Sequence, residues 1–158
     1  MTSKYLVPYR MKPLAIAVLI PTVLFGVYVV QHDLEPDWLD ATVPAFFFDE
    51  FFGDRSWFKM TENNLLNELL GIVVIVSSLV VAFSKERIED EYIAKIRLES
   101  LVWAVWVNYI ILILAFVLVY ELTFFWVMII NMFTTLWAFI LRFNWKTYQL
   151  RKALSNDQ

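Results

Sequence analysis

The chain has 158 residues, which is the length of one domain, and 60% of them are hydrophobic while only 18% are charged. This composition leaves too little polar surface for a water-soluble globule, and a net charge of −3 with no basic patch argues against nucleic-acid binding. Because there is no Cys and only one His, disulfides, thiol nucleophiles and Cys-ligated metals are excluded, and histidine acid–base chemistry has little basis.

Four apolar stretches alternate with polar segments. They span residues 14–30, 65–83, 101–120 and 124–141. A helix needs about 20 residues to cross the hydrocarbon core, and backbone groups in lipid must be bonded within their own segment. The sequence therefore predicts an all-α integral membrane protein, a four-transmembrane-helix bundle that forms a single domain over residues 1–158.

The basic residues predict how the bundle is oriented. They lie before the first stretch, between the second and third, and after the fourth, and only Arg55 and Lys59 break this sorting. Lys and Arg near the ends of membrane spans favour the cytoplasmic side. We therefore expect a multi-pass protein with both termini in the cytoplasm (N-in/C-in). The first stretch is expected to be retained, because no small-residue cleavage site follows Val30.

The loop after the first stretch is rich in phenylalanine and acids. Thr42 and Pro44 are typical of a helix start. On a helical wheel one face then carries Phe47, Phe48, Phe51, Phe52 and Phe58, and the other carries Asp49, Glu50, Gly53 and Asp54. This pattern predicts an amphipathic helix near 44–58, lying on the outer membrane surface or on the bundle.

The loop between the second and third stretches contains no Gly or Pro. The second helix is therefore free to continue past the membrane and the third to begin before it. Residues 84–100 then form either a projecting helical hairpin or an oblique interfacial helix. Asp90 is placed to cap the second arm of this segment, with Glu91 in the first turn. The sequence predicts a cytoplasmic helical extension near 84–100.

One acidic cluster resembles the start of a calcium-binding loop. Its metal-ligand candidates are His32, Asp33, Glu35 and Asp37. Pro36 interrupts the pattern, and Trp38 stands where an EF-hand requires Gly. We therefore interpret the cluster as an acidic juxtamembrane loop and expect neither a metal nor a cofactor.

Polar residues lie deep in the last two stretches. They are Asn108, Asn131, Thr134 and Thr135. A tight turn makes these helices antiparallel neighbours, so that Asn108 lies level with Thr135. Either Asn108 forms an interhelical hydrogen bond with Thr134 or Thr135, worth about 0.6–2 kcal/mol, or these residues line a polar path. Ion pathways usually contain a charge, and the middle of each stretch has none.

Small residues mark the second stretch. Gly71, Ser78 and Ala82 favour close helix packing, and Ser78 and Ala82 form a small-xxx-small pair. The partner is either another helix of the same bundle or a second copy of the chain.

No catalytic signature is present. The sequence contains no Ser-His-Asp set, no P-loop, no dinucleotide fingerprint and no paired-carboxylate motif. We therefore expect a non-enzymatic sensory, regulatory or assembly module that works with a protein partner or as a homodimer in the lipid bilayer. The alternative is an oligomeric small transporter or channel with its path at Asn108, Asn131, Thr134 and Thr135.

Two runs in the second half carry a resemblance. They are SKERIEDEYIAKIRLESLVWAVWVNY at 84–109 and FFWVMIINMFTTLWAFILRFNW at 124–145. With these runs the chain resembles small uncharacterised inner-membrane proteins of bacteria, which have four predicted helices and often sit beside helix-turn-helix regulators. The resemblance implies a bacterial inner-membrane location, a similar topology and a regulatory or sensory role. It carries over no site residue.

Overall fold

The computed structural model describes residues 5–48 and 56–156. Its helices are α1 (Met11–His32), α2 (Leu66–Ala82), α3 (Glu91–Leu118) and α4 (Glu121–Asn156), with a short 3-10 helix at Asp37–Leu39 and strands β1 (Asp40–Phe48) and β2 (Ser56–Asn64). The chain forms two compact units. One comprises Met1–Leu19 with Ile75–Gln158, and the other comprises Ile20–Val74.

Three helical segments are long and apolar enough to cross a membrane. They are Met11–His32, Glu91–Leu118 and Thr123–Ser155, with mean hydropathies of 2.3, 2.5 and 2.0. They confirm that the first, third and fourth apolar stretches form long helices. α2 has 17 residues, or about 26 Å at a rise of ~1.5 Å per residue, which is less than the ~30 Å hydrocarbon core. Membrane crossing by α2 therefore stays a prediction.

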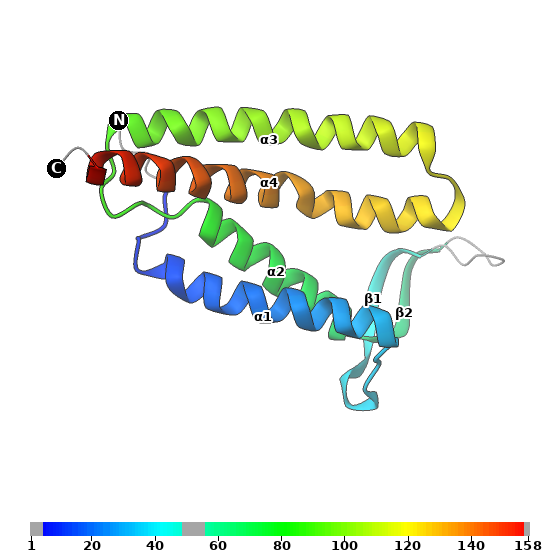
Figure 1. Cartoon of the computed structure of the whole chain (residues 1–158). Helices are drawn as coiled ribbons and strands as arrows, with labels where there is room; N and C mark the ends of the chain where they lie inside the picture. The colour runs from blue at the N-terminus through cyan, green and yellow to red at the C-terminus, as the bar shows by residue number, and fades with distance from the viewer. Residues whose placement is uncertain (1–4, 49–55, 157–158) are drawn as a thin grey trace. The chain divides into compact units, whose positions relative to one another are not determined.

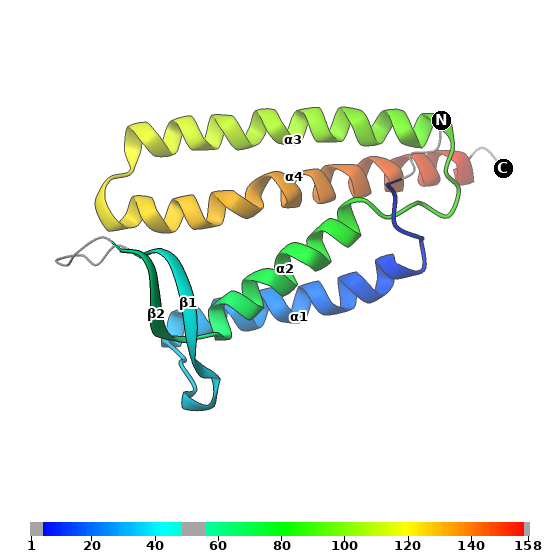
Figure 2. The same ribbon diagram turned by 180° about the vertical axis from the view of Figure 1, so that it is seen from behind.

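In the first unit, α3 and α4 run antiparallel and side by side, as both views show (Figures 1 and 2). The connection between them is only Val119–Tyr120. α4 continues to Asn156, well past residue 141, where the apolar stretch ends. No Gly or Pro lies in this continuation, and nothing in its sequence stops the helix. The continuation brings polar residues of α4 to the start of α3.

The predicted helical extension near 84–100 is correct only in its second half. α3 does begin at Glu91, but α2 ends at Ala82 and residues 83–90 are not helical. The N-terminal segment explains this. The Val7 N–H donates to the Phe83 carbonyl at 3.0 Å, and the Lys85 N–H donates to the Val7 carbonyl at 2.9 Å. These bonds satisfy backbone groups that would otherwise require a helix.

The predicted cap of α3 is confirmed. Asp90 Oδ1 accepts a hydrogen bond from the Ile93 N–H at 2.8 Å. Asp90→Ala should lower the free energy of unfolding by about 1 kcal/mol, because it removes this acceptor. Asp90→Asn is the matched control and should stay close to the wild type. Thermal unfolding in detergent, followed by circular dichroism, measures both; equal losses in the two variants would contradict the capping role.

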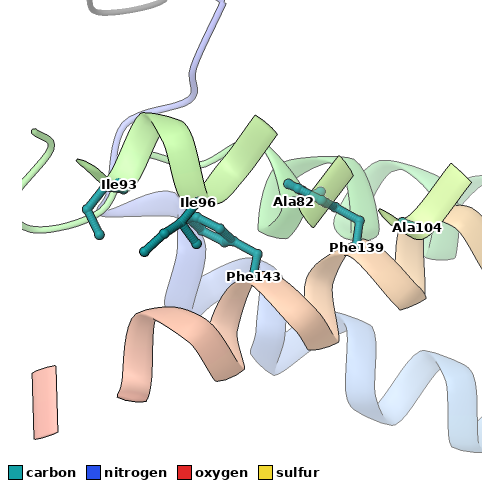
Figure 3. Packing of buried hydrophobic residues seen from close by; sticks show 6 residues of the cluster. All are labelled: Ala82, Ile93, Ile96, Ala104, Phe139 and Phe143. Carbon is teal, nitrogen blue, oxygen red and sulfur yellow. The ribbon is translucent and has the colours of Figure 1, made fainter. Parts of the chain in front are cut away.

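The hydrophobic core of the first unit lies where α2 ends and α3 begins. It is formed by Ala82, Ile93, Ile96, Ala104, Phe139 and Phe143 (Figure 3). The Phe139 and Phe143 rings stack with centroids 5.7 Å apart, and both residues are almost fully buried. Ala82 and Ala104 are small, which leaves room for these rings. This core fixes the positions of the polar groups beside it.

The predicted amphipathic helix near 44–58 is wrong in its described part. In the second unit β1 and β2 form an antiparallel hairpin in which Thr42 pairs with Glu62 and Phe46 with Phe58. Both strands contain β-branched and aromatic residues, which favour strands. Pro44 is tolerated because each strand of a two-stranded sheet has an unpaired edge. Residues 49–55, which hold much of the predicted phenylalanine face, lie outside the described residues.

Hydrogen bonds close the base of the hairpin. Asn64 Nδ2 donates to Asp40 Oδ1 at 2.7 Å and to the Pro36 carbonyl at 2.9 Å. The Leu65 N–H donates to the Leu39 carbonyl at 3.1 Å. The strands are therefore held together at the end where α2 starts.

Candidate functional site

A cluster of charged side chains lies at one end of the first unit, centred on the buried Glu86 in the 83–90 segment. The Glu86 side chain is only 4% exposed. Lys12 Nζ lies 2.5 Å from its Oε1, and Arg151 Nη2 lies 2.7 Å from its Oε2. One carboxylate thus joins the start of α1, the 83–90 segment and the end of α4. We call these three residues the Glu86 cluster.

The continuation of α4 supplies one polar face of the site. Asn144, Thr147 and Arg151 follow one another at spacings of three and four residues, which places them on the same side of a helix. Asn144 Oδ1 accepts a hydrogen bond from Lys12 Nζ at 2.9 Å, and its Nδ2 donates to the Ile140 carbonyl at 2.8 Å. Asn144 is therefore held by its own helix while it orients the lysine.

A second ion pair fastens the same segment to α3. Arg97 meets Glu89 through two hydrogen bonds, Nη1 to Oε1 at 2.5 Å and Nη2 to Oε2 at 3.2 Å. Such paired contacts are among the stronger charge-assisted hydrogen bonds. Glu89 Oε2 also accepts the Glu86 N–H at 2.9 Å. The Arg97–Glu89 pair therefore positions the backbone that carries the central carboxylate.

Phe143 connects the two ion pairs with the core. Lys12 Nζ lies 5.6 Å and the Arg97 guanidinium carbon 5.0 Å from its ring centroid. Both distances fall within the ~6 Å reach of cation–π attraction. The ring is therefore packed on Phe139 and is also contacted by two cations.

The Glu89 carboxyl group has a pKa below its ordinary value of 4.5. Burial by itself raises this pKa, but the hydrogen bonds from Arg97 and from the Glu86 N–H, with the charges of Arg97 and Lys85, outweigh it. The folded-state pKa is below the unfolded one, so the ionised carboxylate stabilises the fold above the ordinary pKa. That stabilisation is lost as the pH falls through the folded-state pKa.

Glu89→Gln tests this pH dependence. We expect it to lower the free energy of unfolding by about 1 kcal/mol at neutral pH, because the charge-assisted bonds to Arg97 are weakened. The difference from the wild type should shrink as the pH is lowered from 4.5 through the lower folded-state pKa, where the wild-type carboxylate also loses its charge. Thermal unfolding measured across this pH range checks the prediction. A difference that stays constant with pH would contradict it.

A half-open cavity of about 310 Å³ adjoins the Glu86 cluster. Its lining residues are Tyr9, Lys12, Pro13, Ile16, Glu86, Asn144, Thr147, Tyr148 and Arg151. Thr147 is 4% exposed, and its Oγ1 has no hydrogen-bond partner among the described residues. Buried hydroxyl groups nearly always have such a partner. Thr147 therefore lines the cavity, while its hydroxyl group is buried and left unsatisfied by the described chain.

The polar residues predicted between α3 and α4 do not form the expected hydrogen bond. Asn108 is 9% exposed, and its Oδ1 has no partner among the described residues. Thr134 Oγ1 instead donates to the Ile130 carbonyl of its own helix at 3.2 Å. Asn131 Nδ2 is likewise buried without a partner in the described part of the chain, and Thr135 is half-buried.

The predicted packing residues of α2 behave differently from one another. Ser78 and Ala82 are fully buried, and the Trp137 Nε1–H donates to Ser78 Oγ at 3.4 Å. Ser78 therefore contacts α4 of the same chain. A side chain at Gly71 would meet no atom within 4 Å. The absence of a side chain at Gly71 is therefore not needed for close packing within the described residues.

The side chains of the acidic cluster at the end of α1 do not gather around one point in the described structure. His32, Asp33, Glu35 and Asp37 are all exposed. No group of three or more His, Asp or Glu side chains within the described residues is arranged to hold a metal ion. The His32 ring packs on Tyr28, with centroids 4.4 Å apart.

The Glu86 cluster and its cavity were not predicted from the sequence. One signal was available, because Glu86 and Glu89 lie in a segment whose basic residues set the predicted orientation. Acids in such a segment need cations to compensate their charge. For Glu86 these cations are Lys12 and Arg151, but no spacing rule connects positions so far apart in the sequence.

Chemically, the site can bind and orient a charged group. Two cations and one carboxylate face a half-open cavity, and the carboxylate is already paired with both cations. No protein-family model, no curated protein and no solved structure matches the chain.

Proposed function

We propose that the protein is a non-enzymatic multi-pass protein of the bacterial inner membrane that acts as a regulatory, sensory or assembly module. The supporting observation is the Glu86 cluster, because it gathers ordered charges at one end of the first unit, while the apolar stretches of the long helices carry no charged residue. The basic residues favour the cytoplasmic side for this end, with four spans and both termini inside. The module associates with a protein partner or with a second copy.

The cluster supplies a physical means of regulation. Glu86 compensates a buried lysine from α1 and an exposed arginine from α4 at the same time. Removing one partner from a buried ion pair is strongly unfavourable, so the three segments depend on one another. A signal that moves any one of them therefore changes the stability of the other two. Switches commonly work by such local changes in charge.

The proposed orientation is tested by labelling single cysteines. The chain contains no Cys, so each introduced thiol is unique. Lys152→Cys on α4 should be protected from a membrane-impermeant maleimide in intact cells, and Glu62→Cys on the hairpin should be labelled. Both should react after lysis, which serves as the control for accessibility. Labelling of Lys152→Cys in intact cells would overturn the N-in/C-in orientation.

The proposed association is tested by photo-crosslinking in native membranes. A photoreactive residue at Trp145, an exposed position on α4 near the Glu86 cluster, should capture a second copy or one recurrent protein. The same residue at Ile113, an exposed position in the apolar part of α3, is the matched control and should react with lipid alone. A strict monomer with no captured partner at either position would refute the module.

One observation favours the alternative, an oligomeric small transporter or channel. Asn108 Oδ1 and Asn131 Nδ2 are buried without hydrogen-bond partners in the described residues. Such atoms are costly in a membrane unless water, a solute or another chain provides the missing hydrogen bonds. A path along Asn108, Asn131, Thr134 and Thr135 would do so. Asn108→Leu distinguishes the two functions. A changed solute flux in a folded variant supports the transporter, whereas a change in stability alone supports the module.

A further inference from the structure

The cavity beside Glu86 has the size of a small-ligand site. Its volume of about 310 Å³ lies at the lower end of the range of roughly 300–1,000 Å³ in which proteins bind small molecules. One wall comes from Tyr9 and the first turns of α1, and the other comes from one face of α4. Glu86 forms part of the lining between them.

The charge of the lining favours an anion. Lys12 and Arg151 face the cavity with Glu86 as the only acid of the lining, so the positive charge is in excess. Lys12 Nζ donates hydrogen bonds to Glu86 and Asn144. Arg151 contacts Glu86 through Nη2, and its side chain is 57% exposed. A guanidinium group has further N–H donors and suits phosphate oxygens, so Arg151 is able to bind an anion while it keeps Glu86.

Thr147 adds an independent observation. It lines the cavity, it is 4% exposed, and its Oγ1 lacks a hydrogen-bond partner in the described part of the chain. A hydroxyl group donates readily to an anionic oxygen. Thr147 and Arg151 are four residues apart on α4, and both line the cavity. Because Thr147 Oγ1 is itself buried, the side chain must change rotamer to turn its hydroxyl group into the cavity, where one ligand group can then meet both residues.

The wall formed by α1 is apolar beyond Lys12. Pro13 and Ile16 line the cavity and follow Lys12 into the apolar part of α1. With the membrane placement proposed above, on which this inference rests, the cations lie at headgroup level and Ile16 lies toward the acyl chains. We infer that the cavity binds the phosphate group of an anionic phospholipid. Arg151, Lys12 and Thr147 donate to the phosphate, and Pro13 and Ile16 contact the glycerol and the first part of a chain.

Thermal unfolding of the purified full chain in detergent micelles tests this inference. Added dioleoylphosphatidylglycerol should raise the Tm and saturate, while dioleoylglycerol, which has the same chains without phosphate, should have no effect. Equal stabilisation by dioleoylglycerol would assign the effect to the acyl chains and overturn the inference. Equal stabilisation by soluble glycerol 1-phosphate would keep the phosphate chemistry but overturn its assignment to a lipid.

Two variants and one control locate the effect. Arg151→Gln should weaken the apparent affinity for phosphatidylglycerol by about tenfold, because a charge-assisted bond is lost. Lys152→Gln removes an exposed cation that does not line the cavity, and it should leave the affinity unchanged. Equal losses in both would indicate diffuse attraction to anionic lipid and overturn the site.

Thr147→Val separates binding from folding. The Thr147 hydroxyl has no partner among the described residues, so its removal should not lower the Tm without lipid, while it should reduce the shift with lipid. An unchanged lipid shift in both Thr147→Val and Arg151→Gln would overturn the site. If the wild type showed no Tm shift with lipid but still gave crosslinks at Trp145, only this inference would be refuted. If it gave no crosslinks but still showed the Tm shift, the proposed association would be refuted instead.

Discussion

Replacing Glu86 with glutamine should lower the free energy of unfolding by about 3 kcal/mol, because it leaves a buried lysine without its counter-charge. The Lys12 side chain is 9% exposed, and Asn144 is its only other polar contact in the described structure. Glutamine keeps the shape of glutamate, so the loss reports on charge and not on packing. Thermal or denaturant unfolding in detergent, followed by tryptophan fluorescence, measures it.

A double variant is the decisive control. Lys12→Met combined with Glu86→Gln removes both buried charges and should recover most of the stability that Glu86→Gln alone loses. Arg151→Gln should change stability by only about 0–1 kcal/mol, since that side chain is half exposed and is solvated when unpaired. If the double variant were less stable than Glu86→Gln alone, the cost would come from lost packing, and the account of a charge pair would be wrong.

The long helices were predictable because their signal is local and strong. Continuous apolar stretches leave a chain in lipid no other way to bond its backbone, and three of them are long helices in the structure. The Asp90 cap was predictable for the same reason, since acceptor and donor lie three residues apart. The residues at which the helices end were harder to predict. α4 passes residue 141 because nothing in the following polar sequence breaks it.

The features that the sequence predicted wrongly or not at all depend on contacts between residues far apart in the chain. The phenylalanines near 44–58 fit one face of a helix, but β1 and β2 obtain their hydrogen bonds from each other. The 83–90 segment is not helical, contrary to the prediction, because Val7, far away in sequence, forms hydrogen bonds with its backbone. The Glu86 cluster needed the same long-range information. Pattern reasoning found the acids and the bases there but could not pair them.

Phe143 joins the core to the charged site, so its truncation should have the other large effect. Phe143→Ala should lower the free energy of unfolding by about 3–5 kcal/mol, as expected for a buried phenylalanine whose removal leaves a cavity. The residue is 1% exposed and stacks on Phe139. Phe125→Ala on the same helix is the control. Phe125 is 62% exposed, and its truncation should change stability by no more than about 0.5 kcal/mol.

Phe143→Leu divides the contribution of the ring into two parts. Leucine keeps most of the apolar volume but has no π face for the cations of Lys12 and Arg97. We expect a loss of about 1–2 kcal/mol, made up of imperfect packing and lost cation–π attraction. If cation–π attraction matters, the Leu variant should lose less further stability than the wild type when Arg97 is also replaced by Met. Equal further losses in the two backgrounds would show that Phe143 acts through packing alone, since independent effects add.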